Sequence, residues 1–121
     1  MANNEEPKHE CEDVIIITKH SKIIHSIYSK CNTFIKSTHG VLNESNYTLI
    51  LTHVMRNLNK HNLYGWEKKK LAVEIMILLL DALGSPDCVS RFTVEVTADL
   101  IEMIYTYSIH RYKHNKKCVI L

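Results

Sequence analysis

The chain has 121 residues, of which 45% are apolar and 23% are charged. This length supports one domain with a single core and is too short for two. Three glycines and two prolines exclude a collagen-like, linker-rich or loop-dominated protein. Fifteen basic and 13 acidic residues leave a net charge of +2, so we expect no nucleic acid among its partners.

Charge separates the two ends of the chain from its middle. Residues 1–13 contain five acids and one lysine, whereas residues 110–117 contain four lysines and arginines and no acid. We therefore expect an acidic flexible tail over 1–13, a helical bundle domain over 14–110 and a basic tail over 111–121.

Targeting and cysteine patterns favour a reducing cytosol. The four cysteines are too few and too widely spaced for a disulfide framework, and none has C-x-x-C spacing. The first 13 residues lack the apolar stretch of a secretory signal. The longest apolar run, Leu71–Leu83, includes Glu74 and Asp81 and is shorter than the roughly 20 residues of a membrane-spanning helix.

The first half of the domain predicts two helices. Apolar residues recur at helical spacing over Val14–Ser37, although the β-branched run Val14–Ile17 fits a short strand as well as a helix. A second helix is expected over Asn46–Lys60, with Ser45 or Asn46 as its N-cap.

A third helix is the clearest of all, over Trp66–Leu83. Glu67 lies in its positive first turn, and Gly84 is expected to end it in the left-handed conformation. The helix is apolar nearly all round, so we expect it to be central, with Trp66 as an anchor at its start.

A fourth helix is expected to follow directly, with Ser85 as N-cap and Pro86 at its first position. Short connections favour antiparallel neighbours, so the predicted fold class is all-α, a small antiparallel bundle of about four helices. The apolar stripe of the fourth helix is predicted to consist of Val89, Phe92, Val96, Leu100, Met103, Ile104 and Tyr107.

The most specific motif is Cys118-Val119-Ile120-Leu121, which fits the C-a-a-X pattern read by geranylgeranyl transfer. One lipid chain alone gives marginal membrane binding, so a second signal matters. Cations near an anionic leaflet add about 1 kcal/mol each. Cys118 is therefore the expected lipidation site, and the expected membrane-contacting cations are Arg111, Lys113, Lys116 and Lys117.

Other clusters predict less. His110 and His114 share a helix face with Cys118, but this end of the chain is a poor frame for tetrahedral zinc. Glu95, Asp99 and Glu102 form an acidic row that most simply faces solvent. The Lys68–Lys70 triplet could face this row from a neighbouring helix or contact phosphates, and it most simply serves solubility. We expect no catalytic residue, no cofactor and no metal site.

The stretch Tyr64-Gly65-Trp66-Glu67-Lys68-Lys69-Lys70-Leu71, followed by an Ile/Leu-rich helix and then Asp99-Leu100-Ile101, resembles small helical proteins of large nucleocytoplasmic DNA viruses. These proteins have no assigned activity, and the resemblance covers the last half of the chain. The C-a-a-X end and the histidine content depart from it. The resemblance implies an all-helical viral protein made in a eukaryotic host, and it implies no site residues.

These patterns lead to one expected function and one alternative. We expect a non-enzymatic interaction protein, prenylated and tethered to the cytosolic face of a membrane, which binds another protein or itself. The third helix is more apolar than a monomer of this size requires, so a homodimer is also expected. The alternative is a viral structural or assembly protein that packs through its helical bundle without lipidation.

Overall fold

The computed structural model describes residues 15–115, with side chains as far as Tyr107. The regular structure in this part is helical throughout, which confirms the predicted all-α class. A helical stretch over residues 15–19 comes first. It is followed by α2 (Ser21–Thr38), α3 (Glu44–Leu58), α4 (Gly65–Leu83), α5 (Pro86–Arg91) and α6 (Val94–Asn115).

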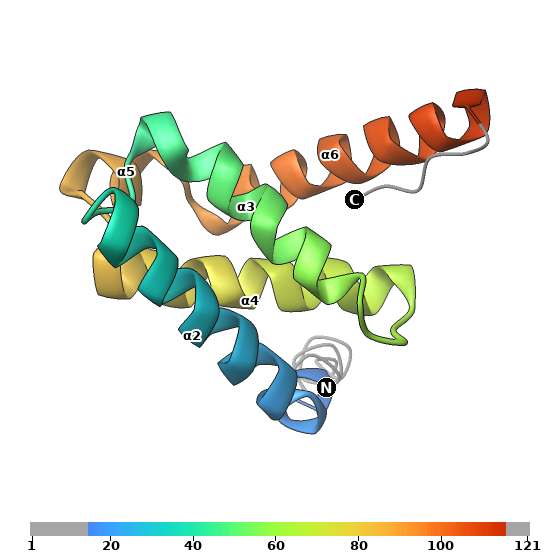
Figure 1. Cartoon of the computed structure of the whole chain (residues 1–121), viewed down its shortest axis with the longest axis horizontal. Helices are drawn as coiled ribbons and strands as arrows, with labels where there is room; N and C mark the ends of the chain where they lie inside the picture. Colours follow the sequence, from blue (N-terminus) through green and yellow to red (C-terminus); the bar gives the residue numbers. More distant parts are fainter. Residues whose placement is uncertain (1–14, 116–121) are drawn as a thin grey trace, which may run out of the picture.

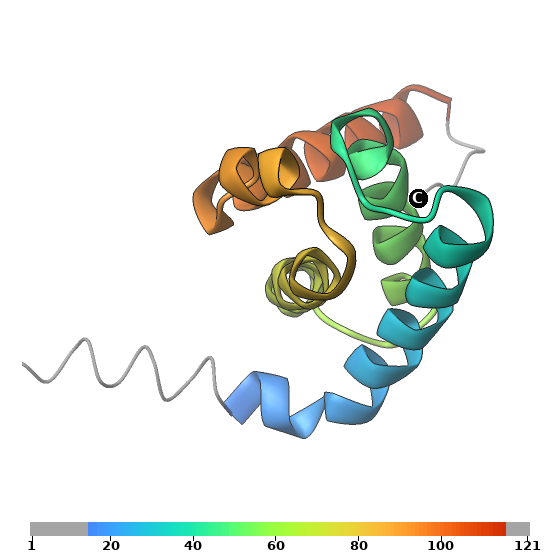
Figure 2. The ribbon, with the colours of Figure 1, turned by 90° about the vertical axis from the view of Figure 1, so that its left-hand side faces the viewer.

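The first predicted segment is divided into two helical pieces. Residues 15–19 are helical, so the open choice between strand and helix is decided for helix there. His20 interrupts the path at φ −109° and ψ 26°, and α2 leaves at an angle (Figure 2). After α2, Gly40 takes a φ of +83°, a left-handed conformation that glycine adopts without a Cβ penalty.

Helix α3 begins earlier than predicted, and its N-cap is Asn43 rather than Ser45 or Asn46. The Asn43 side chain accepts hydrogen bonds from the backbone N–H groups of Ser45 and Asn46. In return, the Asn43 N–H donates to Oδ1 of Asn46 at 2.8 Å. This reciprocal capping box satisfies donors that a helix start otherwise leaves open, so the helix begins at Glu44.

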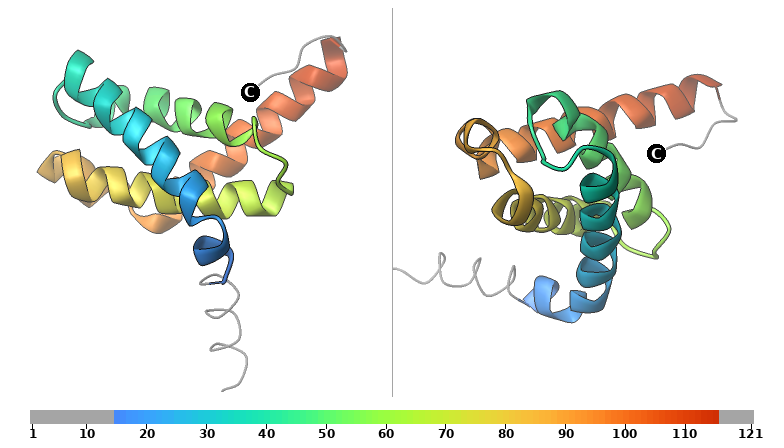
Figure 3. Two further views of the ribbon diagram at one scale, coloured as in Figure 1. Left: turned by 60° about the horizontal axis from the view of Figure 1, so that its bottom comes forward. Right: turned by 60° about the vertical axis from the view of Figure 1, so that its left-hand side comes forward.

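Helix α4 has the predicted extent and the predicted central place. Figure 2 looks nearly along it, with α2 and α3 on one side and α6 on another, and Figure 3 shows the same packing from two further directions. Leu71, Ala72, Ile75, Met76 and Leu79 have no exposed surface. The apolar side chains on several sides of α4 are therefore buried against the other helices of the same chain.

The expectation for Gly84 is wrong in conformation. Its φ of −73° and ψ of 139° are extended rather than left-handed. A Cβ there would lie 2.6 Å from the Leu80 carbonyl oxygen, so close approach is what favours glycine. Next to Gly84, the Ser85 N–H donates to the Leu42 carbonyl at 2.9 Å, and the Leu42 N–H donates to Leu83 at 2.8 Å.

The fourth predicted helix is broken into two. Ser85 and Pro86 do start α5 as predicted, but Phe92 leaves the helix at φ −99° and ψ 78°. Thr93 then accepts a hydrogen bond on Oγ1 from the Val96 N–H at 3.2 Å, which supports the start of α6. The β-branched sequence around Thr93 has low helix propensity, so local preference does not hold the helix together there. The break at Phe92 instead places its ring against that of Tyr47.

Helix α6 crosses α4, and its far end runs clear of the other helices (Figure 1). It continues to Asn115, beyond the domain boundary expected at residue 110. Within residues 15–115, no helix is both long enough and apolar enough to cross a membrane.

Candidate interaction surface

The predicted lipidation site lies outside the described residues, as do Lys116 and Lys117. Arg111 and Lys113 lie on the last turns of α6, where the backbone is described and the side chains are not. The structure therefore does not test the membrane-contacting role expected of these residues. The structure does describe the helices on which α6 packs, together with their exposed surfaces.

The apolar stripe predicted for the fourth helix is largely on the wrong face. Met103 is 66% exposed and Tyr107 is 62% exposed, and Val89 and Val96 are exposed as well. The buried face of α6 instead carries Thr97 and Ile101, with Leu100, Ile104 and Tyr105 packed at its edges.

A polar contact holds α6 in this register. The hydroxyl groups of Tyr47 and Thr97 lie 2.6 Å apart, buried between α3 and α6. The Tyr47 ring also stacks on Phe92, with ring centroids 3.8 Å apart and an interplanar angle of 10°. Burial raises the pKa of Tyr47 to about 12, although the Thr97 hydrogen bond lowers it slightly. The single Tyr47 side chain thus fixes both the break at Phe92 and the first turn of α6.

This register leaves a row of apolar side chains on the outer side of α6, which we call the outer stripe: Val96, Leu100, Met103 and Tyr107. Their spacing of four, three and four residues places them along one line of the helix. Leu100 lies at the edge of the core, and the other three are exposed. Of the stripe predicted for the core, three residues do pack against it, namely Phe92, Leu100 and Ile104. The other four are exposed: Val89, Val96, Met103 and Tyr107.

A second apolar surface is an open groove of about 470 Å³ between α4 and α6. Trp66, expected as an anchor at the start of α4, forms part of the groove wall and is 53% exposed. Ile17, from the helical stretch before α2, also lines the groove. The remaining apolar lining residues are Val73, Val94 and Ala98.

Lysine and glutamate side chains bridge the two helices that form this groove. Lys69 Nζ lies 2.8 Å from Glu102 Oε2 and 4.7 Å from the centre of the Tyr105 ring. Of the possibilities that the sequence leaves open for the lysine triplet, an approach to the acidic row is seen for Lys69 and Glu102. Both side chains are partly exposed, so solvent weakens their attraction.

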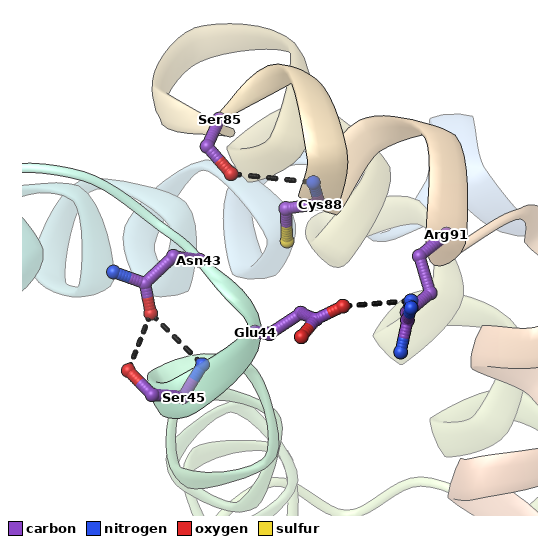
Figure 4. Close-up of polar contacts among 6 residues, drawn as sticks. All are labelled: Asn43, Glu44, Ser45, Ser85, Cys88 and Arg91. Carbon is purple, nitrogen blue, oxygen red and sulfur yellow. Dashed lines mark hydrogen bonds and ion pairs between the residues drawn. The ribbon is translucent and has the colours of Figure 1, made fainter.

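Polar side chains surround a hollow of about 770 Å³ at the starts of α3 and α5 (Figure 4). Glu44 and Arg91 form an ion pair across it, with Oε2 and Nε 2.7 Å apart. Asn43 and Ser85 cap the two helices with their side-chain oxygens. Figure 4 draws three sets of contacts: Asn43 with Ser45, Ser85 with the Cys88 N–H, and Glu44 with Arg91. Two of them are helix caps and the third is an ion pair, so these residues have a structural role.

Two cysteines lie within the described residues, and both are free and buried. Burial raises the pKa of Cys31 to about 11, and it raises the pKa of Cys88 as well, with Glu44 adding to the effect. A raised pKa keeps a thiol protonated and poorly nucleophilic. These two thiols therefore act as small apolar core groups.

A histidine–glutamate pair joins the bend before α2 to the start of α4. Glu67 Oε1 accepts a hydrogen bond from the Tyr64 N–H at 2.9 Å, and Oε2 lies 3.5 Å from His20 Nε2. The Tyr64 bond and, less strongly, His20 hold the pKa of Glu67 below its usual value, against the opposing effect of burial. No group of three or more metal-ligating side chains is found within the described part of the chain.

Comparisons of the chain with protein families, with curated proteins and with solved structures find no match. The resemblance to small viral helical proteins therefore stays a prediction. Function has to be argued from the surfaces themselves. Two exposed apolar surfaces on or beside α6 are the features that the helical body offers to a partner.

Proposed function

We propose that this protein is a non-enzymatic helical interaction protein, held at the cytosolic face of a membrane by a prenyl group on Cys118. Its antiparallel helical body provides the binding surface, and α6 connects that body to the modified end. The single observation that carries the tether is the sequence Cys118-Val119-Ile120-Leu121 placed after four cations. The observation that carries the interaction role is the exposed outer stripe of α6.

The geometry of α6 is compatible with a tether. Its far end extends away from the other helices (Figure 1), and Arg111 and Lys113 lie on its last turns. Cations beside a lipid chain supply the second signal that stable membrane residence needs. The direction of α6 thus supports the proposal that its end carries charge and lipid to a membrane.

Isoprenoid labelling in eukaryotic cells tests the tether. We expect the wild-type chain to incorporate a geranylgeranyl analogue and Cys118→Ser to incorporate none. Cys11→Ser is the matched control, because it removes another cysteine near a chain end and should label like wild type. Equal labelling of wild type and Cys118→Ser would contradict the proposal.

The mass of the C-terminal peptide from the native source gives an independent reading. Prenyl transfer requires that Leu121 carries the free carboxylate, so the proposal predicts a lipidated and trimmed peptide that ends at Cys118. A peptide with an unmodified Cys118, together with stoichiometric amounts of the chain in purified virus particles, would instead support the assembly-protein alternative. In that case the outer stripe would serve particle assembly without a membrane.

A further inference from the structure

Two exposed aromatic side chains lie at the start of α4. Tyr64 is the N-cap of this helix and is 71% exposed, and Trp66 in its first turn is 53% exposed. Both residues combine an apolar ring with a polar group. This combination is typical of residues that lie between the lipid headgroups and the acyl chains of a membrane. Two such rings left exposed so close together indicate a contact surface.

Lysines accompany the two rings. Residues 60–70 contain four lysines and a single acid, Glu67. Glu67 is only 9% exposed and accepts a hydrogen bond from the backbone at the start of α4, so the charge that this segment presents to solvent is positive. Lys69 already pairs with a glutamate of α6, whereas Lys60 is exposed and Lys68 is half-buried on the same segment.

This composition favours a bilayer over a protein as the partner. Interfaces between proteins are enriched in aromatic residues but depleted in lysine. At a membrane surface, in contrast, aromatic rings and lysines act together, because the rings enter the interfacial region while the ammonium groups stay at the headgroups. An anionic bilayer is therefore the partner that matches both the rings and the charge of this segment.

The start of α4 also lies at the same end of the molecule as the far end of α6 (Figures 1 and 3). A Cβ added to Gly65 would lie 2.9 Å from the Tyr105 hydroxyl oxygen, so the first residue of α4 packs directly on α6. From Tyr105, α6 continues to Asn115, over about 15 Å at roughly 1.5 Å per residue. With α6 inclined toward the membrane plane, its far end and the start of α4 can both contact one membrane.

We propose that the start of α4 is a second membrane-contacting surface, in which Tyr64 and Trp66 enter the headgroup region of an anionic bilayer and Lys60 and Lys68 contact its headgroups. Its place beside the tether rests on the proposed function. The contact itself needs no prenyl group, so it is measured on unmodified protein. In the modified chain it would add to the single lipid, which alone attaches a protein only marginally.

Fluorescence of Trp66 tests the proposal directly, because this residue is the only tryptophan of the chain. We expect phosphatidylcholine vesicles that contain phosphatidylserine to shift the emission of the unmodified full chain to shorter wavelength. Lipids brominated near the headgroup should quench it, because the ring then lies beside the bromine atoms. Vesicles of phosphatidylcholine alone should bind roughly tenfold more weakly or less, since they lack the negative charge.

The charge contribution is tested with Lys60→Gln/Lys68→Gln. Each cation near an anionic surface changes the binding constant roughly fivefold, so this double variant should bind the anionic vesicles roughly 25-fold more weakly. Lys30→Gln/Lys36→Gln is the matched control, because both lysines are exposed on α2 and the net charge of the two variants is equal. The control should bind like wild type.

The contribution of the rings is tested with Tyr64→Ser. Serine is favoured at helix N-caps, so the start of α4 is kept, and Trp66 remains as the reporter. We expect binding to weaken severalfold and the emission shift to decrease. Leu49→Ser is the control, because Leu49 is an apolar residue of α3 that is 48% exposed, and it should bind like wild type. Circular dichroism shows whether each variant is folded.

Trp66 emission that stays unchanged at every lipid concentration would overturn the proposal. So would an equal response to vesicles with and without phosphatidylserine, or equal weakening in the two double lysine variants. Binding to vesicles without any change at Trp66 would assign the contact to the basic tail, which overturns this surface and leaves the tether intact. A failure of the isoprenoid labelling would leave the Trp66 measurement unaffected, so the two failures are distinguishable.

Discussion

Helices α4 and α6 are both long and both rich in apolar residues, yet the fold treats them differently. α4 is packed among α2, α3, α5 and α6, and its Ile75, Met76 and Leu79 are fully buried. α6 is packed on one side, with Met103 and Tyr107 exposed on the other. Apolar character in a helix therefore shows that a surface exists to be covered, and neighbouring elements decide whether this chain or a partner covers it.

The largest contrast between the two helices should appear when each loses one apolar side chain. Leu79→Ala in α4 leaves a cavity in a fully packed site, so we expect a loss of about 2–5 kcal/mol in the free energy of unfolding. Met103→Ala in α6 should change it by less than about 0.5 kcal/mol in dilute solution. Urea unfolding of both variants measures the difference, and equal losses would show that the α6 stripe is covered within the monomer.

The choice between the two faces of α6 depends on the Tyr47–Thr97 contact. Tyr47→Phe keeps the ring stacked on Phe92 but leaves the buried Thr97 hydroxyl without its partner, which should cost about 1–3 kcal/mol. Thr97→Val leaves the Tyr47 hydroxyl unpaired at a similar cost. The double variant should lose less than the sum of the two, because neither polar group then remains. Strictly additive losses in urea unfolding would mean that the contact does not couple α3 to α6.

The start of α4 gives a smaller effect that depends on pH. The pKa of Glu67 is lowered from its ordinary value of 4.5, so its ionised form stabilises the folded chain. This contribution is fully present above pH 4.5 and is lost as the pH falls through the lowered pKa. Glu67→Gln keeps an acceptor for the Tyr64 N–H but removes the charge, so its stability should fall less in acid.

Unfolding midpoints of the wild type and of Glu67→Gln, measured from neutral pH into the acid range, check this expectation. Glu74→Gln is the control, because it removes one negative charge from the same helix without touching the Tyr64 cap. If wild type and Glu67→Gln lost stability in parallel, the Tyr64–Glu67–His20 arrangement would have no share in the acid response.

The bridge between α4 and α6 should give the smallest effect. Lys69 and Glu102 are 30% and 58% exposed, and pairs of this kind contribute about 0–1 kcal/mol. We therefore expect Glu102→Gln to lower stability by a few tenths of a kcal/mol at low salt and by nothing measurable at high salt. A loss that persists in high salt would indicate that the pair organises the groove beyond its charge.

Much of the fold could be predicted from local patterns in the sequence. The long apolar segment Trp66–Leu83, with Glu67 at its start and Gly84 after it, has nearly the bounds of α4. Ser85 and Pro86 likewise identify the start of α5. These signals were sufficient because capping and first-turn chemistry involve residues close in sequence.

The break at Phe92 and the register of α6 could not be predicted in this way. The outer stripe has better apolar spacing than the face that is buried, which contains the polar Thr97. That face is chosen because Tyr47, fifty residues earlier, supplies a hydrogen bond and a stacking surface. A contact between residues so far apart leaves no periodic trace in the sequence.

The candidate interaction surface follows from that same choice. Residues 94–107 carry two rows of apolar side chains, one on each of two helix faces. A single packing partner covers only one of these faces. That doubling was a usable signal for a contact surface on α6, but it could not show which line the core would take. The predicted tether, in contrast, depends only on the sequence of Cys118 and its neighbours, which lie outside the described residues. It therefore stays a prediction.

The most direct test of the account is the rate at which hydrogen peroxide oxidises each methionine, read by mass spectrometry in dilute solution. Exposure governs this reaction, so Met103 should oxidise far faster than the buried Met76 in dilute solution. A Met103 that oxidises as slowly as Met76 would contradict the exposed outer stripe of α6 on which the account depends.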